Sequence, residues 1–287
     1  MTGAVLVDKP AGVTSHDVVQ TVRRRLGTKA AGHTGTLDPF ATGLLVVLVG
    51  RATRLARFVE GQLKTYLATA RLGIRTDTDD FTGRVVESSD IGRLDPAEVA
   101  LALAGFVGTS LQRPPDFSAK HVGGQRSYQK ARRGEAVQLE SVSVTVTGLE
   151  VLECKPPLVT FRAEVSAGTY IRGIARDLGE RLGVGAHLTS LRREAIGSLR
   201  VEDSTPLADL SAGALVPPAC VLGNMAAVEL DADMRVAVSH GRAVVDNRAA
   251  GQRGSRTDVA LLADGELMAV ARAEDGFLRP TVVLTTG

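Results

Sequence analysis

The chain of 287 residues carries 34 Lys and Arg against 32 Asp and Glu, so its net charge is only +2. An apolar fraction of 44% is ordinary for a chain that buries a core, and it excludes general disorder. The longest apolar run, residues 44–49, is far shorter than the roughly 20 residues of a membrane span, and the first residues do not resemble a signal peptide. Two isolated cysteines exclude a disulfide scaffold and a cysteine zinc site. We therefore expect a cytoplasmic protein without a membrane segment.

The charge is unevenly distributed along the chain. Residues 1–75 hold 11 Lys and Arg against 4 Asp and Glu, a local charge of +7, whereas residues 76–115 hold 3 against 7. Arginine accounts for 28 of the 34 basic residues, and its guanidinium binds phosphate in a bidentate manner. A GC-rich gene would produce the same arginine bias. A basic stretch in a nearly neutral chain is nevertheless typical of a surface that binds a polyanion.

Hydrophobic periodicity and turn residues predict the elements of the first 200 residues. In chain order we expect a strand at 3–7, a helix at 16–26, a loop at 32–39, a strand at 44–49, a short helix at 51–60 and a strand at 64–74. There follow a helix at 95–106, an antiparallel pair of strands at 142–152 and 158–166, a helix at 171–182 and an extended segment at 187–199. Thr14 or Ser15 caps the first helix. Helices and strands do not alternate as in βαβ units, which favours an α+β fold.

The last third of the chain has a different composition. Residues 201–225 are acidic and contain Pro206, Pro217 and Pro218, which is typical of a connector, and short apolar segments follow at 259–262, 267–271 and 281–284. The Asp264-Gly265 pair between the first two segments is a strong hairpin signal. We therefore expect a catalytic domain at 1–205, a connector at 206–226 and a small β-domain at 227–287.

Residues 32–39 contain the densest set of reactive side chains. A histidine, two threonine hydroxyls and the carboxylate of Asp38 occur between two glycines and a proline, although no Lys-Ser/Thr pair completes a phosphate-binding P-loop. Judged by chemistry alone, this segment is either a functional loop or a turn in which Asp38 caps the next helix.

Five sequence blocks together resemble the TruB family, the bacterial tRNA pseudouridine-55 synthases. The most specific is GHTGTLDPFATGLL at 32–45, and the others keep the order of the family at 8–15, 64–78, 168–179 and 185–193. This resemblance implies a pseudouridine synthase fold, a mixed and largely antiparallel sheet flanked by helices, followed by a small C-terminal PUA-like β-barrel. It also implies isomerisation of uridine 55 in the T loop of tRNA to pseudouridine, with base flipping and cleavage and re-formation of the glycosidic bond.

The same resemblance assigns roles to individual residues. Asp38 matches the catalytic aspartate or nucleophile, which adds to the ring, attacks C1′ or removes a ribose proton. Arg172 matches its partner cation, and Tyr66 matches the tyrosine that stacks on the base and assists catalysis. His33, Tyr66, Tyr170 and Leu191 match residues that bind the substrate. The alternatives are a surface arginine at a helix start, a strand tyrosine, core packing for Tyr170 and Leu191, and a loop histidine bonded to backbone.

The expected partner is the T arm of tRNA, bound by a monomer with no metal and no organic cofactor. Candidate phosphate contacts are basic residues in two parts of the chain, namely Arg23, Arg24, Arg25, Lys29, Arg51 and Arg54, and then Arg126, Lys130, Arg132 and Arg133. At 114–121 the chain departs from the family pattern, because the lysine comes one place early, at Lys120, and His121 follows it. The rival function is that of a tRNA-folding chaperone, which would bind and open the T arm without catalysis.

Overall fold

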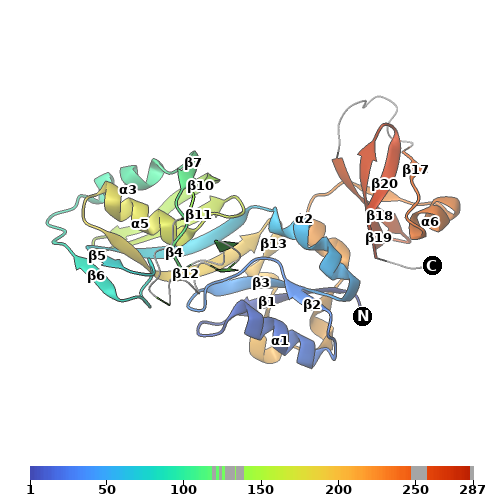
Figure 1. Cartoon of the computed structure of the whole chain (residues 1–287), viewed down its shortest axis with the longest axis horizontal. Coiled ribbons are helices and arrows are strands. Elements are labelled where there is room, and N and C mark those ends of the chain that lie inside the picture. Colours follow the sequence, from blue (N-terminus) through green and yellow to red (C-terminus); the bar gives the residue numbers. More distant parts are fainter. Residues whose placement is uncertain (118–120, 123–124, 127–132, 134–138, 247–256, 285–287) are drawn as a thin grey trace. The chain divides into compact units, whose positions relative to one another are not determined.

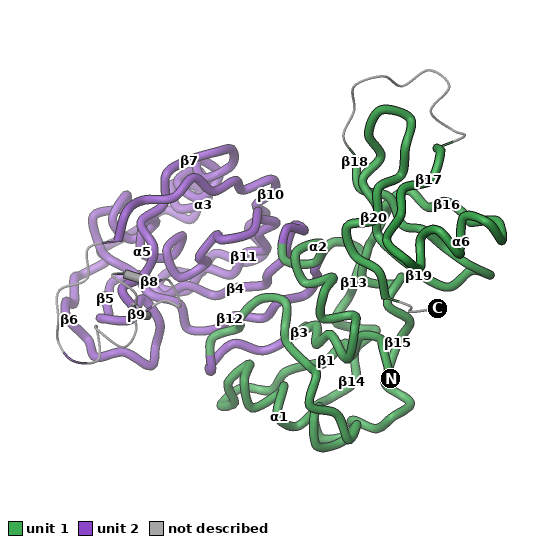
Figure 2. Tube along the Cα trace, turned by 45° about the vertical axis from the view of Figure 1, so that its right-hand side comes forward, with its two compact units in different colours: residues 1–38, 44–60, 197–287 green, residues 39–43, 61–196 purple. Residues whose placement is uncertain are grey.

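The computed structural model describes residues 1–117, 121–122, 125–126, 133, 139–246 and 257–284. These residues form two compact units, which are distinguished by colour in Figure 2. Unit 1 comprises residues 1–38, 44–60 and 197–287, and unit 2 comprises residues 39–43 and 61–196. The chain therefore leaves unit 1 after residue 38, runs through unit 2 at residues 39–43 and returns to unit 1 at residue 44.

Unit 1 is built around β1 (Gly3–Lys9), a buried strand with an almost continuous apolar sequence. Strand β14 (Thr205–Pro206) pairs with it in parallel and β15 (Leu215–Val216) in antiparallel orientation. Strand β3 (Thr42–Val49) lies next to β1 in the sheet. The last three residues of β3 also pair in antiparallel orientation with β2 (Ala31–His33). Parallel and antiparallel pairs thus occur in the same sheet.

Helix α1 (Ser15–Arg25) covers part of this sheet with an apolar face. Thr14 is its N-cap and forms a capping box with Asp17, in which each side chain accepts from the backbone N–H of the other residue. Val18 and Val22, one turn apart, are buried on the same face. The predicted helix is confirmed, and Thr14 rather than Ser15 is its cap.

Short elements complete the core part of unit 1. The helix expected at 51–60 begins as a 3₁₀ helix and becomes α-helical only in its last turn. The elements are η1 (Gly50–Leu55), α2 (Ala56–Glu60), β13 (Leu199–Arg200), η2 (Val201–Asp203), η3 (Leu207–Asp209), η4 (Ala212–Ala214) and η5 (Pro218–Leu222).

The C-terminal segment forms a separate sheet with its own core. Its strand order is β16-β18-β19-β20-β17, and helix α6 packs against β17 and β20. Asp264 and Gly265 both have positive φ values, 53° and 77°, which a two-residue type I′ hairpin requires and which confirms the predicted hairpin. The elements are β16 (Ala227–Glu229), α6 (Ala232–Ser239), β17 (Val244–Val245), β18 (Thr257–Ala263), β19 (Glu266–Glu274) and β20 (Phe277–Val283).

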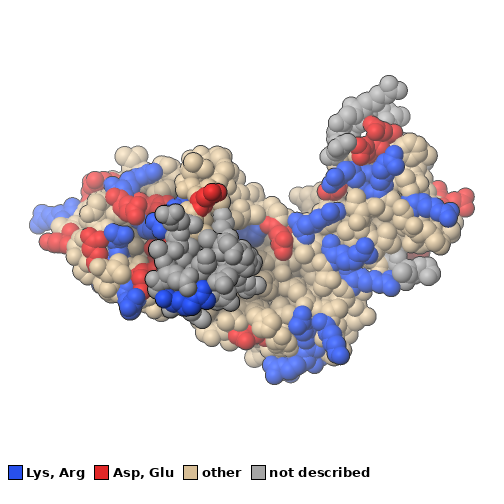
Figure 3. All heavy atoms as spheres, viewed as in Figure 1, with Lys and Arg blue, Asp and Glu red and all other residues tan. Residues whose placement is uncertain are grey.

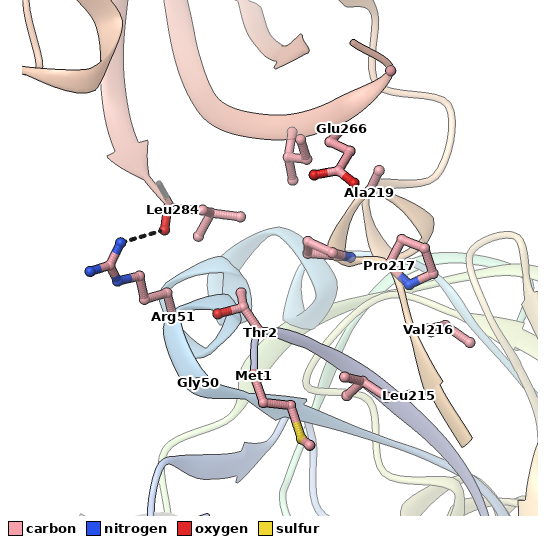
Figure 4. A pocket seen from close by; sticks show the side chains of 13 residues that line it. Met1, Thr2, Gly50, Arg51, Leu215, Val216, Pro217, Ala219, Glu266 and Leu284 are labelled. Carbon is pink, nitrogen blue, oxygen red and sulfur yellow. Dashed lines mark hydrogen bonds between the residues drawn. The ribbon is translucent and has the colours of Figure 1, made fainter. Parts of the chain in front are cut away.

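Unit 1 also contains a hollow of about 880 Å³ (Figure 4). It is lined mainly by apolar residues from the start of the chain, the connector and the C-terminal hairpin, including Met1, Leu215 and Leu267. At its edge the Arg51 guanidinium donates a 3.0 Å hydrogen bond to the Leu284 carbonyl. Arg54 donates likewise to the Val283 carbonyl at 2.7 Å.

Unit 2 contains an antiparallel sheet of long strands in the order β12-β4-β11-β10-β7 (Figure 1). Helix α5 packs on β12 and β4, and α3 packs on β10 and against α5. The elements are β4 (Lys64–Leu72), α3 (Pro96–Ala104), β7 (Gly108–Gln112), β10 (Val142–Lys155), β11 (Leu158–Val165), α5 (Ile171–Arg181) and β12 (Ala186–Ile196). Two small hairpins accompany them, formed by β5 (Ile74–Thr76) with β6 (Val85–Ser88) and by β8 (His121–Val122) with β9 (Gln125–Arg126).

The mixed sheet, the helices beside it and the separate C-terminal sheet confirm the expected α+β fold. Two local expectations were wrong. Residues 31–33, within or next to the predicted loop, form strand β2, because their backbone pairs with Val49, Leu48 and Val47. The strand predicted at 64–74 is interrupted at Gly73, whose φ of +87° breaks the extended conformation.

Candidate active site

One face of the unit 2 sheet carries two of the predicted base-binding residues, Tyr66 and Leu191. Along β4 the buried side chains alternate with half-buried or exposed ones, and Tyr66 belongs to the buried set, with only 7% of its surface exposed. Leu191 of β12 pairs with Ala68, two residues from Tyr66, and is 8% exposed. Directly opposite residues of an antiparallel pair project to the same face, so Leu191 lies on the same face as Tyr66.

The N-terminus of α5 places Tyr170 and Arg172 in unit 2. Tyr170 is the N-cap and is half-buried, and Arg172 lies in the first helical turn with only 4% of its surface exposed. The Arg172 guanidinium donates to the carbonyls of Thr78 at 2.8 Å and Phe117 at 3.0 Å. The alternative of a surface arginine is therefore wrong, because this guanidinium is buried and held by two loops.

Asp80 provides negative charge next to Arg172. Its Oδ2 lies 3.6 Å from Arg172 Nη1, and its Oδ1 accepts from the Thr82 N–H at 3.0 Å and from the hydroxyls of Thr78 and Thr82 at 2.9 and 2.5 Å. A carboxylate with that many donors is held in one orientation. The acidic loop at 77–80 is therefore structural in part, since it fixes the position of the buried arginine.

A second arginine, Arg176, lies one turn further along α5. It donates to Asp79 Oδ2 at 3.2 Å, to Asp177 Oδ1 at 2.8 Å and to the Arg113 carbonyl at 2.9 Å. Burial raises the pKa of Asp79 to about 6, and the nearby Arg176 and Arg172 only partly oppose this shift. Burial would lower the pKa of Arg176, but Asp177 and Asp79 raise it above its usual value.

Asp38 ends the loop that follows β2 in unit 1. It is half-buried, and the preceding Leu37 is held by Ser15, whose hydroxyl donates to the Leu37 carbonyl at 3.1 Å and accepts from its N–H at 2.9 Å. Ser15 and Leu37 are each 3% exposed, so this contact is shielded from water. A turn and strand β3 follow Asp38, so the alternative in which Asp38 caps a helix is wrong.

The five residues after Asp38 belong to unit 2. Thr42 and Gly43 pair in parallel with Arg192 and Arg193 of β12. Gly43 has a φ of +100°, and a Cβ at this position would lie 2.3 Å from the Arg193 carbonyl oxygen. Glycine at this position is therefore required both by the backbone conformation and by the close approach of the two strands.

His33 lies in β2, and its Nδ1 accepts a 3.4 Å hydrogen bond from the Gly35 N–H. This is close to the alternative of a histidine bonded to local backbone. The ring is half-buried, and the contact fixes its orientation relative to the first residues of the Asp38 loop.

The predicted RNA contacts near the end of α1 differ in exposure. Arg24, Arg25 and Lys29 are exposed, whereas Arg23 is half-buried and donates to the Ala31 carbonyl at 2.8 Å. Figure 3 shows basic side chains gathered over the region of α1. Lys120, Lys130 and Arg132 lie outside the described residues, and the side chains of His121 and Arg126 are not described.

Sequence reasoning missed the groups that hold these residues. Ser15, Asp80 and Gln112 act on residues 22 to 92 positions away, and no local pattern indicates such contacts. In the part of the chain that the structure describes, no group of three or more His, Cys, Asp and Glu could hold a metal ion. Nor does any described helix have the length and apolar character that crossing a bilayer requires.

Two families of known proteins match consecutive parts of the chain. Residues 23–171 match the family described as TruB family pseudouridylate synthase (N terminal domain), and residues 172–217 match the tRNA pseudouridylate synthase B C-terminal domain. The chain is similar to two proteins named tRNA pseudouridine synthase B. It is 41% identical to that of Burkholderia mallei, covering 100% of this chain and 98% of the relative, and 43% identical to that of Thermobifida fusca, covering 98% of each.

A solved structure agrees with these matches. The crystal structure of a Cbf5-Nop10-Gar1 complex contains a chain with 27% identity and a TM-score of 0.77, covering 99% of this chain and 85% of that one. The described fold is therefore that of the Cbf5/TruB type of pseudouridine synthase. Within that class, the chain belongs to the TruB family of pseudouridylate synthases.

Proposed function

We propose that this chain isomerises uridine 55 in the T loop of tRNA to pseudouridine. The names of its relatives, tRNA pseudouridine synthase B, support an isomerase that acts on a tRNA uridine. The observation that carries the proposal is the buried Arg172 guanidinium, fixed by two carbonyls and by Asp80 beside Tyr170. A fixed cation of this kind suits a site that has to stabilise a carboxylate or a negatively charged base.

The reaction exchanges one bond of the uracil ring for another. The C1′–N1 bond breaks, the base turns, C1′ bonds to C5, C5 loses its proton and N1 gains one. We assign to Asp38 the role of the nucleophile or base that starts this reaction. It acts in its ionised form, which a neighbouring cation favours. Tyr66, Tyr170 and Leu191 bind the uracil, Tyr66 also assists loss of the C5 proton, and Arg172 compensates negative charge.

The target base has to leave its stack before it can react. Flipping costs a few kcal/mol and is offset by stacking on an aromatic ring and by backbone contacts. We assign the stacking to Tyr66, an RNA contact to His33 and phosphate contacts to Arg24, Arg25 and Lys29. The proposal includes a monomer, since each of these roles is supplied by one chain, and none of the roles requires a metal or an organic cofactor.

Replacement of Asp38 by asparagine tests the assignment. We expect Asp38→Asn to abolish tritium release from tRNA labelled with [5-³H]uridine, because the amide is neither a nucleophile nor a base. Filter binding of the same tRNA should stay within roughly tenfold of wild type, about 1.4 kcal/mol.

The matched control is Asp95→Asn. Asp95 caps α3 by accepting from the Ala97 N–H, and asparagine caps equally well, so turnover should not change. Wild-type turnover by Asp38→Asn would show that the catalytic assignment is wrong. Tight binding of tRNA by the wild-type protein without any tritium release would instead support the chaperone function.

A second experiment tests the position. Pseudouridine mapping in tRNA from cells that lack this chain should show loss at position 55 while other sites keep their modification. Loss of pseudouridine at another position would still support the isomerase activity but would show that its target is a different uridine.

A further inference from the structure

We infer that Gln112 is a positioning residue for the base pocket, because its side-chain amide holds the peptide of Tyr170 at the start of α5. This inference rests on the proposed function, since it treats Tyr170 and Arg172 as part of the uracil site. We assign to Gln112 no contact with the substrate or with the reacting atoms.

The contact has two hydrogen bonds of opposite polarity. Gln112 Oε1 accepts from the Tyr170 N–H at 2.8 Å, and Gln112 Nε2 donates to the Tyr170 carbonyl at 2.9 Å. Gln112 is 4% exposed and is the one buried residue of β7, whose other four residues are exposed. A side-chain amide that bonds both polar groups of one residue fixes the position and the orientation of that backbone.

The backbone at the start of α5 needs a hydrogen-bonding partner from outside the helix. The first N–H groups of a helix lack intrahelical acceptors, and the side chain of Tyr170 makes no capping hydrogen bond. The Tyr170 carbonyl also accepts from the Ile174 N–H at 3.2 Å, the first hydrogen bond of the helix. Gln112 therefore acts at the residue from which the helix starts, two positions before Arg172.

Gly173 provides independent support. A Cβ at Gly173 would lie 2.7 Å from Gln112 Nε2 and 3.0 Å from its Cδ. Any larger residue at 173 would displace the amide of Gln112. A glycine in the first turn of α5 therefore leaves the space that the Gln112 side chain occupies.

The residues that follow Gln112 contact the same helix. The Arg113 carbonyl accepts from Arg176 at 2.9 Å, and the Phe117 carbonyl accepts from Arg172 at 3.0 Å. Gln112 is thus the first of three contacts between one segment and the N-terminal half of α5. Loss of the amide contact should move both the half-buried ring of Tyr170 and the guanidinium of Arg172.

Substitution by glutamate separates the two hydrogen bonds. In Gln112→Glu the ionised carboxylate still accepts from the Tyr170 N–H but has no donor for the Tyr170 carbonyl. A protonated carboxylic acid restores that donor, and burial raises the pKa of a glutamate. At pH 8 the kcat of the variant should therefore be roughly one tenth of the wild-type kcat, because about one hydrogen bond is lost. As the pH falls to 5, the kcat of the variant should approach that of wild type.

The assay is tritium release from labelled tRNA with the full chain, and the control is Asn224→Asp. Asn224 is exposed in the connector, and its variant should show the wild-type pH profile. We expect the effect in kcat, with tRNA affinity within threefold of wild type, which corresponds to about 0.65 kcal/mol. An unchanged Gln112→Glu kcat at pH 8, or a deficit that does not depend on pH, would overturn the inference.

Hydrogen exchange gives a readout that does not need turnover. Gln112→Ala should accelerate amide exchange in a peptide covering residues 169–175, whereas Asn224→Asp should not. Wild-type exchange there would overturn the inference even if the variant loses stability elsewhere. Absence of tritium release by the wild-type chain would count against the proposed function alone, because the exchange experiment tests Gln112 separately.

Discussion

At the scale of single residues, buried polar contacts hold the groups to which we assign catalysis. Ser15 holds the backbone just before Asp38, and Asp80 holds the guanidinium of Arg172. Each contact is shielded from water, so an unmatched partner would cost about 1–3 kcal/mol. The stability of these loops thus depends in part on a few buried hydroxyls and carboxylates.

Asp79 allows a prediction about pH. Its pKa is raised from 3.8 to about 6 by burial, although Arg176 and Arg172 favour the charged form and Asp116 and Asp177 disfavour it. Between these two pKa values the folded state binds more protons than the unfolded state, so this group makes the protein less stable as the pH rises from 4 to 6. An asparagine side chain at this position would carry no charge at any pH.

We therefore expect Asp79→Asn to gain stability relative to wild type as the pH rises from 4 to 7, by at most about 3 kcal/mol. Urea unfolding of both proteins across this range measures the difference. Asp90→Asn, at an exposed loop, serves as the control, and a difference between Asp79→Asn and wild type that does not change with pH would contradict the prediction.

At the scale of elements, strand pairing after Asp38 depends on one glycine. Gly43 and Gly12 both have positive φ values, +100° and +85°, but only Gly43 has backbone atoms where a side chain would be placed. The nearest atom to a Cβ at 43 is the Arg193 carbonyl oxygen at 2.3 Å, whereas nothing lies within 4 Å of a Cβ at 12. An alanine at 12 would therefore suffer only the strain of a positive φ, whereas an alanine at 43 would also clash with the backbone of Arg193.

Gly12→Ala should cost about 1–2 kcal/mol of unfolding free energy, the strain of a left-handed residue. Gly43→Ala should cost at least about 2 kcal/mol more, because β3 and β12 would have to separate. Denaturant unfolding of the two variants measures this difference, and equal losses would show that the close approach to Arg193 carries no cost.

At the scale of the whole molecule, the local charge of +7 in residues 1–75 does not correspond to one set of phosphate contacts. Arg51 and Arg54 donate to backbone carbonyls of the C-terminal segment, so two of the expected phosphate contacts have a structural role. Arg24, Arg25 and Lys29 are exposed near the end of α1. The domain division at 1–205, 206–226 and 227–287 stays a prediction.

Binding of tRNA should weaken steeply with salt, because phosphate contacts release counterions. Combined replacement of Arg24, Arg25 and Lys29 by alanine should reduce the slope of log K against log salt by roughly 2. A matched triple variant at exposed basic residues of unit 2, Arg84, Arg93 and Lys155, should keep the wild-type slope. Equal slopes for the α1 triple variant and wild type would remove α1 from the RNA-binding surface.

Most elements could be predicted because their signals are local. The capping box of Thr14 and Asp17 lies within one helical turn, and the Asp264-Gly265 hairpin within two residues. The five motif blocks likewise indicate the family, and the family is confirmed. Boundaries were wrong where pairing decides them, as at β2, whose residues are extended because β3 lies beside them.

The sequence by itself determined the class of fold, the family and the residues proposed for the site, since periodicity, turn chemistry and motif order are properties of neighbouring residues. Tertiary structure alone decided that Arg172 is buried, that Ser15 holds Leu37 instead of capping a helix, and that Gln112 holds Tyr170. These contacts join residues that are 22 to 94 positions apart, and a buried polar group finds its partner only when the fold has brought the two segments together.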